Sequence, residues 1–508
     1  MSRVALESPP LSGLTKLAFG AGSGAYGVSA AVLSAAVLQL YFNQVIGLPA
    51  IWVGVAILAS LMADLVFDPL VGLWSDNLRS RWGRRHPFMY ASAIPAAGFF
   101  YLLWHAPHGL DGTALLFYSV GLLVLVRASL AAFEVPSAAL MPELAPGYHE
   151  RTALMAYRAF FAVAAIAIAN IVLYSVFLRQ DAANPLGVLN RERYAQFAVV
   201  GSVAMVVFIL VSSLSTHSRI RYLHRPPERK ASIGQMLAEM GRVFTNPGLV
   251  VLMSSYILTG VATGITTTLS TYWTLHLWAL KPQAIGPLGA GALGASVLGV
   301  LLAPMLSKAV GKKPAMMSLL ATAMIASMLP ISARLLGIMP PNGSTALYVF
   351  LLADAMVQAT TGLMAVVIMT SMVSDVIEDQ QVKTGVRSEG VLFAVHTLVP
   401  KVTAGVGSVI AGALVSLVAF PVRAKTGSVD PDILRHLALL YLPCIAALNG
   451  AAIVALSFHR MDRATHEQNL ARLREAAALA AQTESAGAEE RGPGPAVGGA
   501  PTVAGKPA

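Results

Sequence analysis

Long apolar segments alternate with short polar turns along most of the chain. Twelve of them reach the roughly 20 residues that a helix needs to cross a bilayer. They lie at 17–46, 51–76, 87–107, 113–143, 151–179, 193–216, 248–278, 283–307, 314–336, 344–380, 389–420 and 432–459. In lipid, only helices and closed barrels satisfy their own backbone hydrogen bonds, and the chain lacks the ten-residue alternation of barrel strands. The pattern therefore predicts an all-α membrane protein with twelve transmembrane helices.

Composition agrees with a surface that faces lipid. The chain has 508 residues, of which 56% are hydrophobic and 12% charged, and its mean hydropathy is +0.67. A soluble domain carries roughly 25% charged residues, so this chain has too few to cover a water-facing surface. The formal net charge is +10, but the basic residues stand in short runs between apolar segments. No nucleic-acid partner is expected, because such a partner needs an exposed basic face interleaved with aromatic residues.

Basic residues in the loops indicate the orientation, because cytoplasmic loops are enriched in Lys and Arg. The loops after the second, sixth and eighth segments carry basic clusters: Arg79, Arg81, Arg84, Arg85, Arg219, Arg221, Arg225, Arg229, Lys230, Arg242, Lys308, Lys312 and Lys313. The opposite loops are poorer, with exceptions at Arg179, Arg191, Arg193, Arg423, Lys425 and Arg435. The balance predicts that both termini are cytoplasmic, which requires an even number of spans.

A hydrophilic stretch at 217–247 divides the chain into two predicted six-helix bundles, 17–216 and 248–460. A faint repeat supports the division: GLWSDNLRSRWGRR follows the second segment and MLSKAVGKK follows the eighth. Duplicated transporter folds show such equivalent turns, although any cytoplasmic turn collects basic residues. Residues 1–16 and 461–508 are expected to be cytoplasmic ends, and the second is expected to be largely disordered after a short helix.

Several other features exclude alternatives. No removable signal peptide is expected, because MSRVALESPPLSGLTK has no apolar core with a cleavage site. The single cysteine, Cys444, allows neither an internal disulfide nor a metal cluster. GAGALG at 289–294 fits a dinucleotide fingerprint but lies inside an apolar segment without a preceding strand. We therefore expect that the protein is not an enzyme and needs no cofactor. Because organelle-targeting signals are lacking, we expect it to lie in a bacterial inner membrane.

Charged residues inside the predicted spans are the candidates for function. A charge at the bilayer centre costs at least about 2.5–3.5 kcal/mol, so such residues usually line a cavity or pair with one another. The candidates are Asp64, Asp68, Arg127, Glu134, Arg158, Asp354, Asp375 and Lys401.

Asp64 and Asp68 lie four residues apart and therefore share one helix face. Two carboxylates on one face repel unless one holds a proton or a cation lies between them, as in a coupling-ion site. Alternatively, Asp68 caps a helix break at Pro69 while Asp64 pairs with an arginine. Lys401 needs a counter-charge, and we expect it in a central cavity near Asp64 or Asp68.

Glu134, Arg127 and Arg158 form a candidate substrate site, because guanidinium donors and carboxylate acceptors together suit hydroxyl-rich ligands. The alternative is a buried salt bridge that locks the fourth and fifth helices. His396, five residues before Lys401, is a candidate proton relay or a plain hydrogen-bonding residue. Trp273 is either an interfacial anchor or, with Tyr272, a stacking surface for a sugar ring.

The sequence resembles the glycoside–pentoside–hexuronide:cation symporters, the melibiose-permease-like branch of the major facilitator superfamily. The resemblance rests on DLVFDPLVGLWSDNLRSRWGRRHPF, FEVPSAALMPELAPGYHERTALMAYRAFFA, MVSDVIEDQQVKTGVRSEGVLFAVHTLVPK and LTKLAFGAGSGAYG, which span positions 14 to 401 with consistent spacing. It implies the major facilitator fold of two six-helix bundles and cation-coupled transport of a sugar, glycoside or related small organic solute.

Residue roles follow from the resemblance. It implies that Asp64 and Asp68 are the cation-site carboxylates, that Lys401 lies near them, and that Glu134 and Arg158 bind the sugar. It also implies a cytoplasmic gate made of two charged turns: Asp76, Arg79 and Arg84 with Asp375, Arg387 and Glu389.

Three positions depart from the family pattern. In melibiose-type members an aspartate of helix one binds the sugar, and this chain has Gly27 at that position. Sodium-using members have an asparagine where this chain has Phe67, and the family has a threonine where this chain has Ala131. Phe and Ala cannot coordinate sodium, whereas a proton needs only a carboxylate. The coupling ion is therefore expected to be a proton rather than sodium, and a small galactoside is disfavoured as the substrate.

The sequence thus predicts a proton-coupled symporter, expected to act as a monomer. Three rivals stay open: a transporter of lysophospholipid-like amphiphiles on the same fold, a non-transporting sensor or assembly factor, and a polytopic membrane enzyme. The enzyme would need acidic or histidine clusters at a loop edge, which the sequence does not show.

Overall fold

The structure is a computed structural model that describes residues 11–459, apart from 111, 146, 183, 185, 223–246 and 385–397. The described elements are helical. In the first half they are α1 (Gly13–Ala21), α2 (Ser23–Val32), α3 (Ala35–Leu38), η1 (Gln39–Ile46), α4 (Ala50–Asn77), α5 (His86–Trp104), α6 (Gly112–Leu144), α7 (Tyr148–Val172), η2 (Leu173–Phe177), η3 (Gly187–Leu189) and α8 (Arg191–His217).

The second half has the same helical character. After η4 (Ile220–Tyr222), its elements are α10 (Pro247–Tyr272), η6 (Trp273–Leu277), α11 (Pro282–Val310), α12 (Lys312–Leu335), α13 (Thr345–Thr384), α15 (Val399–Leu417) and α16 (Pro431–Ser457). In the described part of the chain, eleven helices are long and apolar enough to cross a membrane, or twelve when one bent pair counts as a single span. The protein is therefore a multi-pass all-helical membrane protein.

The bent pair is the first predicted span, which we expected as one helix over 17–46. The chain instead bends by 48° between Gly13–Val32 and Ala35–Ile46. Ser34 takes an extended conformation at the break, and its hydroxyl donates to Ala31 O at 3.1 Å. Hydroxyl groups that bond to the preceding turn compete with the helix ladder and bend it.

Helix α4 is continuous where a break was one alternative. It runs from Ala50 to Asn77 with Pro69 inside it. Asp68 therefore lies on a helical turn rather than at a helix end, and its carboxylate faces the same side as that of Asp64.

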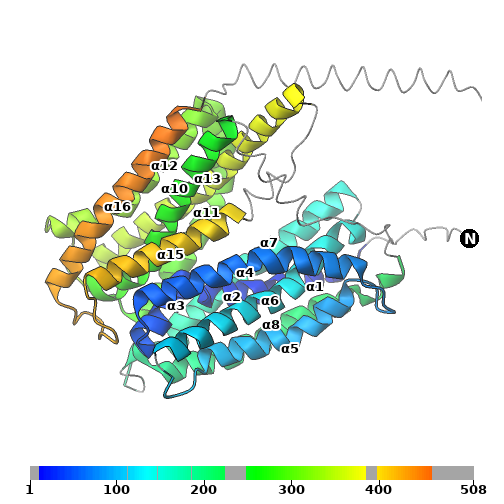
Figure 1. The fold of residues 1–508 in the computed structure, drawn as a ribbon, viewed down its shortest axis with the longest axis horizontal. Helices are drawn as coiled ribbons and strands as arrows, with labels where there is room; N and C mark the ends of the chain where they lie inside the picture. The colour runs from blue at the N-terminus through cyan, green and yellow to red at the C-terminus, as the bar shows by residue number, and fades with distance from the viewer. Residues whose placement is uncertain are drawn as a thin grey trace, which may run out of the picture.

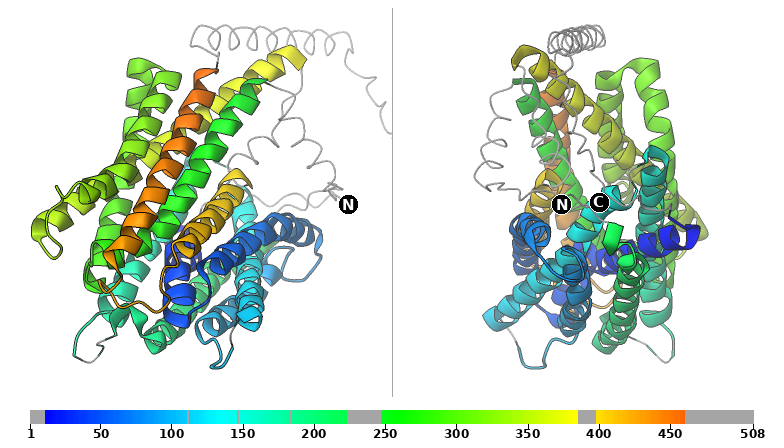
Figure 2. Two further views of the ribbon diagram at one scale, coloured as in Figure 1. Left: turned by 60° about the vertical axis from the view of Figure 1, so that its left-hand side comes forward. Right: turned by 90° about the vertical axis from the view of Figure 1, so that its right-hand side faces the viewer.

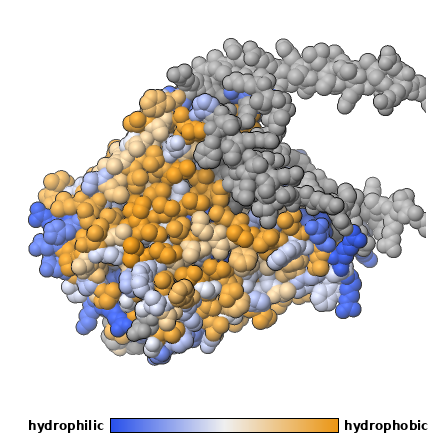
Figure 3. Space-filling model, in the orientation of Figure 1, coloured by the Kyte–Doolittle hydropathy of each residue, from blue (hydrophilic) through white to orange (hydrophobic). Residues whose placement is uncertain are grey.

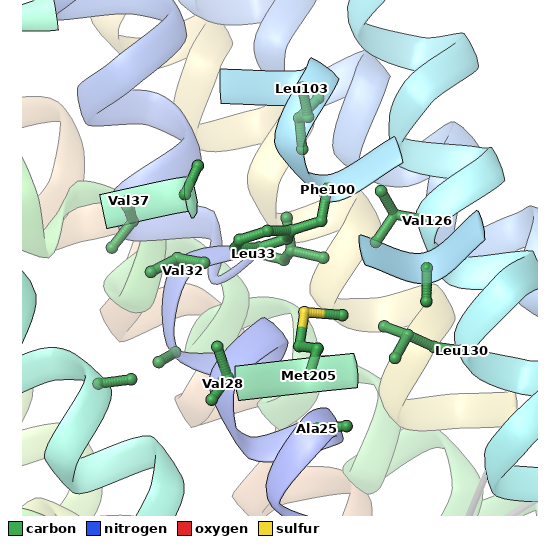
Figure 4. Packing of buried hydrophobic residues seen from close by; sticks show 14 of the residues in the cluster. Ala25, Val28, Val32, Leu33, Val37, Phe100, Leu103, Val126, Leu130 and Met205 are labelled. Atoms are coloured by element: carbon green, nitrogen blue, oxygen red, sulfur yellow. The ribbon is translucent and has the colours of Figure 1, made fainter. Parts of the chain in front are cut away.

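The helices pack as two bundles, α1–α8 and α10–α16, and Figures 1 and 2 show them as two bodies that meet along α4 and α15. Buried side chains fill the interior of the first bundle; Figure 4 labels Val28, Leu33, Phe100, Val126 and Met205 among them. Two further buried clusters occupy the second bundle. Helix α8 ends at His217 and α10 begins at Pro247, at the two edges of the predicted central loop.

The contact between α4 and α15 is very close, and glycines make it possible. A Cβ on Gly412 would lie 2.4 Å from Ala50 O, and one on Gly54 would lie 2.5 Å from Ser408 O. One on Gly405 would lie 2.6 Å from a Leu58 methyl carbon. These contacts run antiparallel along the two helices and form what we call the seam between the halves.

The surface carries many exposed apolar side chains, including Ile94, Phe117, Leu301 and Met305. Figure 3 shows hydrophobic residues across the middle of the visible face and hydrophilic residues gathered at its margins. This distribution is that of a protein whose belt faces lipid and whose ends face water.

Candidate ion- and substrate-binding site

The seam ends in a cluster of four charged side chains. Asp64 and Asp68 come from successive turns of α4, and Arg127 comes from the middle of α6. Lys401 lies in the first turn of α15, directly after Pro400. Three helices from both halves thus bring two carboxylates and two cations together.

Distances show how the four groups pair. Lys401 Nζ donates to Asp68 Oδ2 at 2.7 Å and lies 3.2 Å from Asp64 Oδ2. Arg127 Nη1 donates to the same Asp64 oxygen at 3.1 Å. The Asp64 side chain is 8% exposed and that of Asp68 is 23% exposed. Asp64 is therefore enclosed by two cations, whereas Asp68 contacts one cation among the described residues and has a more open position.

A second charged group lies nearby on α6 and α7. Arg158 Nη2 donates to Glu134 Oε2 at 2.7 Å, and its Nη1 donates to Ser137 Oγ at 2.6 Å. The guanidinium also lies 5.6 Å from the centre of the Phe19 ring. Glu134 Oε1 is buried and has no hydrogen-bond partner among the described residues. The pair links the fourth and fifth long helices, as the salt-bridge alternative expects, yet it leaves one acceptor free for a ligand.

Tyr26 joins the two charged groups and was not singled out from the sequence. It lies within electrostatic reach of Arg127, Glu134, Lys401 and Asp64, and half of its surface is exposed. The neighbouring Gly27 points elsewhere: a Cβ there would lie 2.5 Å from Ala162 O on α7. A polar residue in the apolar GAGSGAYG stretch was the signal that could have identified Tyr26.

The structure buries Trp273 inside the second half. It is 5% exposed, lies in the hydrophobic core of the second half, and packs edge-on against Tyr441 with ring centres 5.6 Å apart. Its ring face is therefore covered, which contradicts a stacking role in this conformation. Burial of this large aromatic side chain in the core stabilises the fold, and a ring that is covered in this way cannot serve as a stacking surface.

The charged turns that were expected to form a gate contain ion pairs within each half. Asp76 Oδ1 lies 3.5 Å from Arg84 and 3.1 Å from Arg85, and both arginines contact Glu143 at the end of α6. In the second half, Lys312 Nζ bonds both oxygens of Asp375, at 2.8 and 2.6 Å. Arg79 and Asp375 also make further interactions, and the cross-half gate stays a prediction. Arg85 and Glu143 are additional members that the sequence argument missed.

Four further candidates complete the set. Arg79 lies in the turn after α4. His396, Arg387 and Glu389 lie outside the described residues. Their predicted roles stay predictions.

Hydrogen bonds between the halves, without an ion pair among those described, close the opposite end of the seam. Tyr272 Oη donates to Asn43 Oδ1 at 2.8 Å, and Ala424 N donates to Gln44 Oε1 at 3.2 Å. Arg423 Nη2 donates to Ile46 O at 2.6 Å. We call this junction of η1, the end of α10 and the segment 418–430 the far-end junction. Polar residues inside the apolar stretch 39–44 were its sequence signal.

Comparison with known proteins decides the family. The family model "MFS/sugar transport protein" matches residues 18–463, which is most of the chain. The chain belongs to this family. Symporter relatives support its glycoside–pentoside–hexuronide:cation branch, and the predicted resemblance is thereby confirmed.

Curated relatives in this family are symporters and importers. An uncharacterised symporter of Synechocystis sp. is 30% identical over 240 residues, which cover 46% of this chain and 42% of that one. The isoprimeverose transporter of Lactiplantibacillus pentosus is 21% identical over 84% of both chains. A putative sulfoquinovose importer of Escherichia coli is 23% identical over 86% of this chain and 88% of its own.

Solved structures show the same fold. The nucleoside transporter NupG superposes with a TM-score of 0.61 at 13% identity, covering 88% of this chain and 99% of its own. The xylose transporter XylE of E. coli superposes with a TM-score of 0.56 at 14% identity, covering 88% and 99%. The solved structures therefore show the major facilitator fold, and the matching family is one of sugar transport proteins.

Proposed function

We propose that this family member couples the movement of protons to that of a sugar, glycoside or related small organic solute by alternating access. The observation that carries the proposal is the bond from Lys401 in the second half to Asp68 in the first. An ion pair that bridges the two moving parts is a suitable sensor of protonation, because its strength depends on the charge of the carboxylate.

The ion pair supports a simple coupling step. A proton on Asp68 removes the negative charge that holds Lys401, so the halves lose a tie at the end of the seam. Protonation then changes the relative free energies of the two conformations, and coupling is that difference. Asp68 is the more exposed carboxylate of the pair, so water reaches it more readily than Asp64.

The proposed solute-binding groups lie beside this cluster. Glu134 Oε1 is an unused buried acceptor, Arg158 is a planar donor, and Tyr26 offers a hydroxyl. Hydroxyl-rich solutes carry both donors and acceptors and therefore suit this set. Relatives that are named for isoprimeverose and sulfoquinovose support the same solute class.

The proposed orientation places the termini in the cytoplasm of a bacterial cell, with twelve spans counting the bent first pair. Basic turns at the end where α1 begins and α16 ends support it. The far-end junction would then be the closed periplasmic side, and the conformation would be inward-facing. The bacterial origin of the isoprimeverose and sulfoquinovose relatives supports the inner membrane.

The test is uptake into proteoliposomes with a panel of labelled glycosides, using an imposed proton or sodium gradient. We expect wild-type accumulation to follow the proton gradient, and Asp68→Asn to lose gradient-driven accumulation while it still exchanges solute across the membrane. Accumulation by Asp68→Asn that still follows the proton gradient would refute the coupling site. Sodium-driven uptake would refute the choice of ion.

The same assay addresses the rival functions. A parallel panel of lysophospholipids separates a lipid transporter from a glycoside transporter. If neither panel is transported under either gradient, a non-transporting sensor becomes the better interpretation.

A further inference from the structure

Arg127 has a different place from the one its sequence position indicates. It shares a face of α6 with Glu134, seven residues away, which pointed to a common substrate site. In the structure, Glu134 is bound by Arg158, and Arg127 turns instead to Asp64 on α4. The guanidinium thus belongs to the ion cluster.

We propose that the guanidinium of Arg127 is a permanently bound counter-ion of Asp64. It occupies the position that a metal cation would take and thereby prevents sodium from binding at the coupling site. This inference rests on the proposed function, in which Asp64 and Asp68 form the coupling site.

The charge balance supports the proposal. Asp64 and Asp68 contribute two negative charges, and Arg127 and Lys401 contribute two positive charges. The other charged pair nearby, Glu134 with Arg158, is balanced by itself. A sodium ion that entered this cluster would add an uncompensated charge, or it would have to displace a bonded cation from a buried carboxylate, and both cost free energy.

The two cations differ in how they are tethered. Arg127 and Asp64 belong to the same half, so rocking of the halves leaves their pair intact. Lys401 belongs to the other half, and its bonds change when the halves move. A counter-ion fixed on a neighbouring helix acts at a high effective concentration, which a dissolved cation must outcompete. Asp64 is therefore a permanent member of an ion pair, and Asp68 is the carboxylate whose partner changes.

The surroundings offer sodium few other ligands. Hard cations need several oxygen donors, and the side chains of Phe67 and Ala131 provide none. A proton needs only one carboxylate oxygen, so Asp68 can accept it while Arg127 stays on Asp64.

The experiment uses the purified full-length protein in detergent and measures its thermal unfolding as sodium replaces choline at constant ionic strength. We expect the wild type and Arg127→Lys to show no response to sodium. Arg127→Gln is expected to gain a saturable stabilisation, with Tm rising by about 2 °C at saturating sodium. Adding Asp64→Asn to Arg127→Gln should abolish this gain, because it removes the carboxylate that the ion would bind.

Two outcomes would overturn the proposal. One is a sodium-dependent stabilisation of the wild type that Asp64→Asn removes, and this arm stays informative even if Arg127→Gln fails to fold. The other is a folded, monodisperse Arg127→Gln that does not respond to sodium. Because the readout is ion binding rather than transport, it tests Arg127 even if proton-driven uptake is not found.

Discussion

At the scale of single residues, Asp64, Asp68 and Glu134 pair with cations that come from other helices. One oxygen of Glu134 is bonded to Arg158 and the other is buried without a described partner; Glu143 at the end of α6 has a similar arrangement, but only Glu134 of these two lies beside the ion cluster. A buried acceptor without a donor costs free energy, so a ligand hydroxyl that donates to it gains affinity.

Glu134→Gln tests this role. The amide weakens the contact with Arg158 and replaces a charge-assisted hydrogen bond to the solute, which is worth about 1.5–3 kcal/mol. The half-saturation concentration for solute exchange should therefore rise about tenfold or more. Glu192→Gln, an exposed carboxylate in the first turn of α8, is the matched control and should behave as the wild type. Unchanged half-saturation in Glu134→Gln would remove this residue from the binding site.

At the scale of helices, the seam between α4 and α15 depends on positions that lack a side chain. Gly54, Gly405 and Gly412 let the two backbones approach, and the contact leads directly to Lys401 and Asp68. Close approach at small residues is a common way for membrane helices to associate.

Gly412→Ala tests the seam. Its methyl group would lie 2.4 Å from Ala50 O, a backbone atom that can give way only if the helix moves. We expect the free energy of unfolding to fall by about 1–3 kcal/mol, the usual range for overpacking. Gly121→Ala on α6 is the control, because its methyl group would meet nothing within 4 Å. Equal thermal stability of the two variants would show that the close approach does not matter.

At the scale of the whole molecule, the two halves are tied by hydrogen bonds at the far-end junction and by the Lys401 ion pairs. The described ion pairs of the charged turns at the other end, such as Asp76–Arg85 and Asp375–Lys312, lie within one half. A protein of this fold that works by alternating access must break the far-end bonds to open on that side. The junction is therefore expected to be a gate.

Cross-linking tests the gate. The variant Gln44→Cys/Ala424→Cys, made in a Cys444→Ser background that lacks other cysteines, joins the halves where Ala424 N bonds Gln44. Oxidation should stop uptake, and reduction should restore it. The control Ala97→Cys/Ser202→Cys joins α5 and α8 within one half and should leave uptake intact. Uptake that survives cross-linking of the first pair would show that the junction does not open.

The local sequence pattern alone determined most of the membrane spans and the family of this protein. Apolar length predicted the spans, because a membrane helix must be apolar for its whole crossing, and motif spacing predicted the family. Asp64 and Asp68 were identified because a charge inside a membrane span costs free energy and usually has a function. The bend at Ser34 was not predicted, since one hydroxyl that bonds to the preceding turn leaves hydropathy unchanged.

Only the tertiary structure decided which side chains meet. Arg127 and Glu134 share a face of one helix, but neighbouring helices give them different partners, Asp64 and Arg158. Trp273 was expected to be an interfacial anchor or a stacking surface for a sugar ring, and the structure instead buries it against Tyr441. Which side chains pair depends on how the helices pack in space. The periodicity of one helix shows which residues share a face, but not which residues of a neighbouring helix this face contacts.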